Sequence, residues 1–163
     1  VGLAMGRIDM MFALLKDWPF DALINHNRYT LLNRSADEMY SWASEAGIAI
    51  INAAPFAGGI LAKGSARTNR VAYQEAEDAD LAPVREFEAV CSRWNVEPGA
   101  AALQFSMRDP RITSTLVGVS RPESVERNLN WASATISPDF WEELKALPYS
   151  MEDPEANRVY RPG

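Results

Sequence analysis

The sequence has little of what metal and disulfide chemistry require, with one cysteine and one histidine among 163 residues. One cysteine cannot form an internal disulfide, and one Cys with one His cannot make a Cys/His zinc site, so no metal is expected. A nucleophile pair of Cys91 and His26 stays open at this point. No apolar run reaches the roughly 18 residues of a membrane span, and no basic leader precedes an apolar stretch. We therefore expect a cytoplasmic protein with no membrane partner.

Positive charge is also scarce. The chain has 16 Lys and Arg against 22 Asp and Glu, a formal net charge of −6, and neither half is basic, so a nucleic-acid partner is not expected. The 47% hydrophobic content suits a folded domain and excludes a disordered acidic tail. The apolar opening, Val1-Gly2-Leu3, differs from the polar start usual for a domain. We expect from it a chain cut inside an element.

Helical and strand periodicities alternate along the chain. The near-continuous apolar run at 48–52 is typical of a strand buried on both faces of a parallel sheet. Ser35 with Glu38, and Ser120 with Glu123, fit the capping-box pattern of a helix start. Residues 65–80 are polar and predict a mobile connection. After the short apolar start, strands are expected at 21–25, 48–52 and 115–119, and helices at 8–16, 35–46, 81–94, 98–107, 120–134 and 137–147.

This order of elements predicts an α/β fold of parallel βα units. Four units make either a small doubly wound sheet or half of an eight-unit barrel, because a full barrel needs about 250 residues. We place the domain at residues 1–147, followed by an irregular C-terminal tail at 148–163.

The segment Gly118–Asn128 is the most informative candidate site. A glycine and a helix start directly after a strand present free amides and the positive end of the helix dipole, which suit an anion. Arg121 can fork onto a phosphate, and Ser124 and Asn128 lie four residues apart on one helix face. The alternative is structural: Ser120 only caps, and Arg121 pairs with a nearby glutamate.

Two further strand ends carry candidate groups. Pro55–Gly64 has two adjacent glycines and Lys63, a pattern that lets backbone approach a ligand, although local chemistry alone slightly favours an ordinary glycine turn. His26 and Tyr29 follow another strand, where a lone His is more often structural than catalytic. Cys91 falls on the apolar side of its helix, which indicates a core thiol.

In order, these motifs resemble the second half of an aldo-keto reductase. Arg28-Tyr-Thr-Leu-Leu32 is similar to the end of the family's sixth strand. Residues 47–51, followed by Pro55-Phe-Ala-Gly-Gly-Ile-Leu61, are similar to its seventh strand and loop. Residues 117–128 are similar to its eighth strand and adenine-side motif. The motifs at 28–32 and 55–61 are most similar to those of the aldose or fucose dehydrogenase branch of the family.

The resemblance implies the C-terminal half of a (β/α)8 TIM barrel that moves hydride between NAD(P)H and a carbonyl, with an aldehyde or sugar as substrate. It also implies a cofactor of NADP or NAD, with NADP slightly preferred because Arg121 suits a 2′-phosphate, although Ser124 stands where many NADP users carry Arg or Gln. His26 and Ala53 fall on the nicotinamide side, where the family usually has Gln and an aromatic residue. The implied residues for the pyrophosphate and adenosine are Phe56, Gly58, Gly59, Lys63, Gly118, Ser120, Arg121, Ser124 and Asn128.

The family's catalytic Asp, Tyr, Lys and His lie on its first four strands, which this chain does not match. No catalytic residue is therefore expected here, and neither His26 nor Tyr29 takes that role. We expect the chain alone to be inactive, with a complementing N-terminal half or a homo-oligomer covering the open sheet edges. The alternative is a stand-alone half-barrel that binds a nucleotide, or is only structural, without catalysis.

Overall fold

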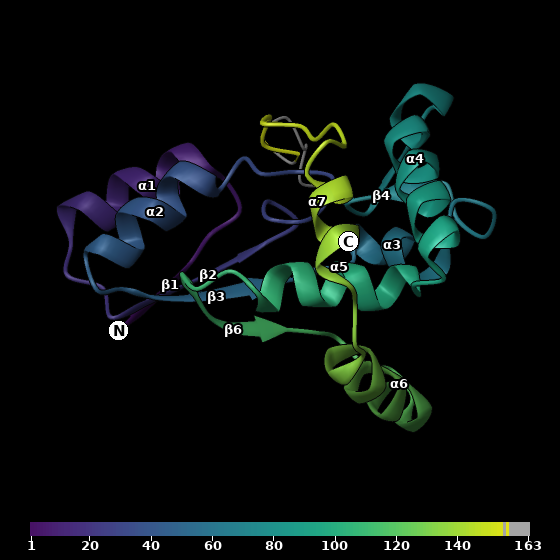
Figure 1. Ribbon diagram of the computed structural model, residues 1–163. Coiled ribbons are helices and arrows are strands. Elements are labelled where there is room, and N and C mark those ends of the chain that lie inside the picture. Colours follow the sequence, from purple (N-terminus) through teal and green to yellow (C-terminus); the bar gives the residue numbers. More distant parts are fainter. Residues whose placement is uncertain (155, 157–163) are drawn as a thin grey trace.

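The computed structural model describes residues 1–154 and 156, and its centre is a four-stranded parallel sheet with helices packed against it (Figure 1). In chain order the elements are β1 (Gly2–Ala4), α1 (Ile8–Asp17), β2 (Ala22–His26), α2 (Asp37–Glu45), β3 (Ala49–Ala53), the 3-10 turn η1 (Ala57–Gly59), α3 (Ile60–Lys63), β4 (Arg70–Val71), β5 (Gln74–Glu75), α4 (Asp78–Trp94), α5 (Pro98–Met107), β6 (Ile112–Leu116), α6 (Pro122–Ser133) and α7 (Pro138–Leu144).

The sheet order is β1-β2-β3-β6, and each neighbouring pair is parallel, which confirms the predicted α/β class. The last strand lies three residues earlier than the predicted 115–119. Thr113 and Ser114 are exposed on this strand, which has a partner on one side only among the described residues. Because the first residues of this edge strand are polar, a pattern of apolar residues could not indicate where it begins.

Alternate residues of the strands face two different environments. Leu23, Asn25, Ile50 and Asn52 are buried under the helices, and Asn25 Nδ2 lies 3.6 Å from Met11 Sδ of α1. On the opposite face, Ala4, Ile24, Ile51 and Ser114 follow one another across the sheet and are half-buried or exposed. The described residues therefore cover one face of the sheet and leave the other open.

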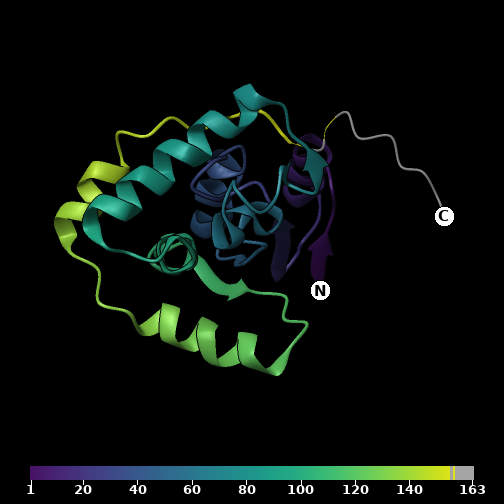
Figure 2. The same ribbon diagram turned by 90° about the vertical axis from the view of Figure 1, so that its right-hand side faces the viewer.

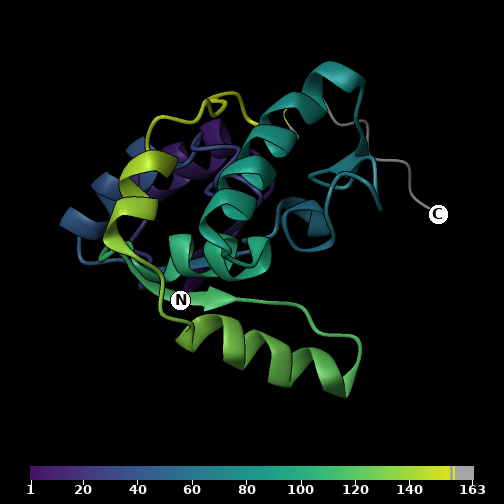
Figure 3. The same ribbon diagram turned by 45° about the vertical axis from the view of Figure 1, so that its right-hand side comes forward.

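One apolar cluster lies between the sheet and α1 and α2, and another lies among the helices that follow β3. Met11, Met39 and Tyr40 belong to the cluster under α1 and α2. Phe87 and Phe140 belong to a second cluster, formed mainly by α3, α4, α5 and α7. Figures 2 and 3 show α6 on the other side of β6 from α4 and α7, where it packs against α5.

Both predicted capping boxes are wrong. The Ser35 hydroxyl donates instead to Asn33 Oδ1 at 2.7 Å, and α2 begins at Asp37. Arg121, not Ser120, is the N-cap of α6, and it makes no side-chain cap. Local side-chain bonding in the preceding turn competes with capping at Ser35.

The polar segment 65–80 holds more structure than its composition suggests. It contains the β4–β5 hairpin and the start of α4. Glu77 and Asp80 form a capping box there, which begins α4 three residues before the predicted position.

The segment after α7 returns to the sheet. Asn33 and Ser150 form an isolated bridge, and the Asp153 carboxylate accepts from Arg28 Nε at 2.8 Å and from the amide of Ile8 at 3.0 Å. Arg28 is completely buried. An irregular stretch is thus held by a buried ion pair across 125 residues of sequence.

Candidate cofactor site

The carboxyl ends of three strands meet at one edge of the sheet. His26 is in register with Ala53, and Ala53 with Leu116. His26 and Ala53 are half-buried and lie on the open face, because their neighbours Asn25 and Asn52 face the helices. The sequence-predicted nicotinamide-side residues are therefore brought together on adjacent strands.

The segment after β3 forms η1 and α3 where the sequence indicated a glycine-rich loop. Gly58 has φ +76, and a Cβ there would lie 2.7 Å from the amide nitrogen of Tyr73 in the β4–β5 hairpin. The hairpin therefore fills the space beside Gly58. Gly59 has φ +105, and a Cβ on it would lie 3.7 Å from Nζ of Lys63, so the exposed ammonium lies beside this turn.

The start of α6 is open. Gly118 has no atom within 4 Å of an added Cβ, and Ser120 and Arg121 are exposed. No described residue forms an ion pair or hydrogen bond with the Arg121 guanidinium, and no side chain caps the helix. Pro122 has no amide hydrogen and the Ser124 amide donates to Arg121 O at 3.0 Å, so Glu123 is the residue of this turn whose amide has no acceptor among the described residues. That amide, the helix dipole and an unpaired guanidinium share the turn, an arrangement that can hold an anion.

Ser124 and Asn128 share one face of α6, as their spacing predicts, and both are half-buried. The Ser124 hydroxyl accepts from Arg127 Nη2 at 3.3 Å. Asn128 Oδ1 is a buried atom without a hydrogen-bond partner among the described residues. An unmet acceptor of this kind costs free energy unless a ligand or water satisfies it.

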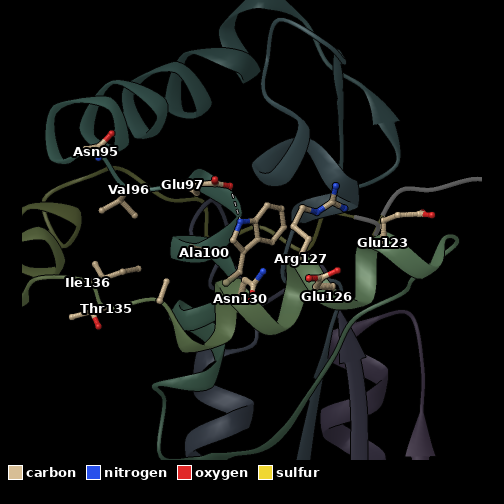
Figure 4. Close-up of a pocket in the computed structure, with 12 residues that line it drawn as sticks. Asn95, Val96, Glu97, Ala100, Glu123, Glu126, Arg127, Asn130, Thr135 and Ile136 are labelled. Carbon is tan, nitrogen blue, oxygen red and sulfur yellow. Dashed lines mark hydrogen bonds between the residues drawn. The ribbon is translucent and has the colours of Figure 1, made fainter.

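Trp131 joins the two halves of the site, and the sequence analysis did not single it out. Its ring packs edge-on against Phe56, with centroids 5.7 Å apart, so the segment after β3 contacts α6 through this pair. Its Nε1 donates to Glu97 Oε2 at 2.7 Å, the dashed line in Figure 4. Trp131 follows Asn128 by three positions, and that helical spacing was the signal in the sequence that could have indicated it.

A cavity of about 510 Å³ lies beside α6, on the side facing the α4–α5 connection (Figure 4). Among its described lining residues are Glu97, Glu126 and Arg127, together with Trp131. None of the sequence-predicted cofactor residues is among them. Arg127 lies 4.9 Å from the Trp131 ring centroid and covers part of its surface.

Cys91 and Tyr29 are both held in their protonated forms. Cys91 is 1% exposed in the cluster under α4, and burial raises the pKa of its thiol to about 12, so it remains a protonated core residue. Burial and a hydrogen bond to Asp109 raise the pKa of Tyr29 as well. Among the described residues, no group of three His, Cys, Asp or Glu side chains could hold a metal ion.

The chain is similar to known proteins in sequence and in fold. The chain matches the aldo/keto reductase family over residues 1–148, and it belongs to that family. It is 29% identical over 146 residues to pyridoxal 4-dehydrogenase of Microbacterium luteolum, covering 89% of this chain and 43% of that protein. It is 28% identical over 146 residues to D-threo-aldose 1-dehydrogenase of a Pseudomonas species, covering 88% and 44%.

The fold agrees with a solved member of the family. The holo form of aldo-keto reductase AKR11C1 from Bacillus halodurans superposes with a TM-score of 0.74 at 17% identity, covering 97% of this chain and 52% of that chain. Aldo-keto reductases are (β/α)8 barrels, and this chain corresponds to about half of one. It likewise spans less than half the length of the two curated relatives named above. In the described part of the chain, no helix has the length and apolar character needed to cross a membrane.

Proposed function

We propose that this chain supplies the half of an NAD(P)H-dependent carbonyl oxidoreductase that holds the adenosine and pyrophosphate end of the cofactor. The observation that carries the proposal is the open start of α6, a helix whose later residue Trp131 packs on Phe56 of the segment after β3. Arg121 without an ion pair and the Glu123 amide without an acceptor lie at the helix start, and Asn128, with its unpartnered Oδ1, follows two turns later on the same face. This turn follows a strand end, where parallel α/β folds bind phosphate.

The proposed roles follow from the chemistry of each group. The Arg121 guanidinium would pair with a phosphate, the Glu123 amide at the start of α6 would donate to it, and Asn128 would lie on the adenine side. Lys63, beside Gly59, would face the pyrophosphate. Gly118 leaves room for the ligand to approach the backbone.

Gly58 fits a different role. Because the β4–β5 hairpin occupies the space next to it, this glycine permits the hairpin contact rather than an approach by the ligand. Phe56 packs on Trp131 and so holds the segment after β3 against α6. This contact, rather than stacking on the cofactor, is the role that its ring fits. Of the proposed cofactor residues, these two would act by positioning the others.

When bound, the cofactor would donate or accept the hydride, and this chain's residues would bind and orient its distal end. His26 and Ala53, on the open face, would border the nicotinamide end. The substrate is proposed to be an aldehyde, an aldose or the corresponding alcohol, consistent with the named dehydrogenase relatives. The groups for proton transfer would come from the family's first four strands, supplied by a complementing half. A cytoplasmic location also stays a prediction.

A matched pair of variants tests the phosphate role. Arg121→Ala should weaken NADPH binding more than NADH binding, by about 1.5–3 kcal/mol, the value of a hydrogen bond to a charged group. Tryptophan fluorescence titration with both cofactors measures this difference, because Trp131 adjoins the site. Arg85→Ala, which removes an exposed pair with Asp78, is the control and should leave both affinities unchanged. Equal losses of NADPH and NADH affinity with Arg121→Ala would refute a 2′-phosphate contact. If neither cofactor binds saturably to the unmodified chain, the proposed cofactor role is wrong, and the alternative of a purely structural half-barrel remains.

A further inference from the structure

Helix α6, which carries the proposed cofactor residues Ser124 and Asn128, is anchored by one buried side chain. Among the residues of α6, all of which the structure describes, only Trp131 is buried. Its ring belongs to a small apolar cluster with Ala100 and Leu103 of α5. The three residues of α6 named here lie on one helix face, because they are spaced by four and three positions. The direction in which this face points therefore depends on how the Trp131 ring is held.

The C-terminal end of α6 is also fixed through its backbone. Gln104 of α5 is 8% exposed, and its Nε2 donates to the carbonyl oxygens of Trp131 and Ala134, both at 2.7 Å. Carbonyls at the end of a helix lack their usual partner within it, so this contact satisfies them. Ser124 precedes Trp131 by seven residues, about 10 Å along the helix, so a tilt of about 10° at this end would move Ser124 by about 2 Å.

Glu97 holds the indole of Trp131 in one orientation. Its Oε2 accepts from Trp131 Nε1 at 2.7 Å. Glu97 is the N-cap residue of α5, and its side chain makes no cap hydrogen bond to that helix. Its backbone is firmly placed, because its carbonyl oxygen accepts from the amides of Ala100 at 2.9 Å and Ala101 at 3.1 Å. The carboxylate therefore bonds to the ring of α6 from a fixed point on α5.

The same ring is linked to a proposed cofactor residue by a second contact. The Arg127 guanidinium lies 4.9 Å from the Trp131 ring centroid, and its Nη2 donates to Ser124 Oγ at 3.3 Å. Because the Ser124 oxygen accepts this bond, its own hydrogen can donate to a further group. A continuous set of contacts thus joins Glu97, the indole, Arg127 and Ser124.

We propose that Glu97 is a positioning residue of the cofactor site, which fixes the direction of α6 by holding the Trp131 indole. This inference rests on the proposed cofactor function. In this role Glu97 does not contact the cofactor, and its carboxylate adds negative charge on the side of an anionic ligand. By electrostatics alone, removing that charge would leave the binding of an anion unchanged or tighten it. Loss of positioning has the opposite sign, so the direction of the effect separates the two causes.

The test compares three variants with the unmodified 163-residue chain. Glu97→Ala removes the acceptor, and Glu97→Gln keeps an acceptor oxygen without the charge. The matched control is Glu143→Ala on α7, which removes the same kind of bond, from Trp94 Nε1 at 2.5 Å, together with an ion pair to Arg93. Calorimetric titration with adenosine 2′,5′-bisphosphate measures affinity, and urea unfolding measures the stability of each variant.

We expect Glu97→Ala to weaken binding of the bisphosphate by about three- to tenfold, the effect of one hydrogen bond expressed as affinity. Glu97→Gln should stay within about twofold of the unmodified chain, because the indole keeps its partner. Glu143→Ala should also stay within about twofold, although it loses at least as much stability as Glu97→Ala.

The positioning role alone is overturned if the unmodified chain binds the bisphosphate and Glu97→Ala binds it equally well or more tightly. It is also overturned if Glu97→Gln or Glu143→Ala weakens binding as much as Glu97→Ala does, because the indole bond would then not be the cause. Absence of bisphosphate binding to the unmodified chain would refute the proposed cofactor function, and this inference with it.

Discussion

At the residue scale, the fit of Trp131 against Gly99 shows what a sequence pattern can and cannot disclose. Proline before Gly99 correctly predicts a helix start at 98. The reason for glycine at the next position is tertiary, since a Cβ there would lie 2.3 Å from the Trp131 ring. Gly99 and Trp131 are 32 residues apart in sequence, so no local pattern indicates the contact. Gly58 also has a tertiary reason that no local pattern indicates, because a Cβ there would meet the β4–β5 hairpin.

Gly99→Ala should therefore destabilise the chain. The added methyl forces Trp131 to move, and overpacking of this kind typically costs about 1–3 kcal/mol. Urea unfolding followed by far-UV circular dichroism measures the free energy of unfolding. Gly118→Ala, where the added Cβ meets nothing within 4 Å, is the matched control and should be nearly neutral. Equal stability of the two variants would contradict the packing account.

At the scale of elements, a cluster around Arg111 joins the turn after β2, helix α2 and the turn before β6. The guanidinium donates to Asp109 Oδ2 at 2.6 Å, to Asp37 Oδ1 at 2.7 Å and to the Tyr29 hydroxyl oxygen at 3.0 Å. Tyr29 in turn donates to Asp109 at 2.5 Å. Apolar periodicity predicted the helices and most strands here. It could not predict these bonds, because Arg111 lies 74 residues from Asp37 and 82 from Tyr29.

This cluster makes stability depend on pH. Burial alone would raise the pKa of Asp109, but hydrogen bonds from Arg111 and Tyr29 outweigh it and hold the pKa below its usual value. A carboxyl with a lowered pKa in the folded state adds stability above its unfolded pKa of about 3.9 and loses it as pH falls below that value.

Asp109→Asn should lower the free energy of unfolding at neutral pH by about 2–3 kcal/mol, since it leaves Arg111 with one fewer carboxylate. It should also flatten the loss of stability on acidification. Urea unfolding at a series of pH values measures both effects. Asp17→Asn, at the exposed end of α1, is the control. A variant that loses stability below about pH 4 as steeply as the unmodified chain would show that another carboxylate is responsible.

At the scale of the molecule, the chain is half of a barrel fold with an open face and two free edges. Among the described residues β1 and β6 each pair on one side only. The sequence predicted this architecture because three motifs follow the family's order. It could not predict how the segment after α7 returns to Asn33 and Arg28, because that segment lacks periodicity and its contacts are distant in sequence.

We predict that the purified chain alone does not reduce aldehydes with NADPH, because the resemblance places the proton-transfer groups on strands that this chain does not match. The decrease of NADPH absorbance with an aromatic aldehyde measures turnover. Arg121→Ala serves as the control for contamination, since it should lower turnover at limiting NADPH only if this chain binds the cofactor. Turnover that is lowered in this way by Arg121→Ala would contradict an inactive half and require a proton donor among its own residues.

The central claim is that this half holds the adenosine end of the cofactor by itself. The most direct measurement is calorimetric titration of the chain with adenosine 2′,5′-bisphosphate, which carries the adenine and the 2′-phosphate but no nicotinamide. The account predicts saturable binding that weakens with Arg121→Ala and with Asn128→Ala. Absence of binding, or binding unaffected by both substitutions, would contradict it.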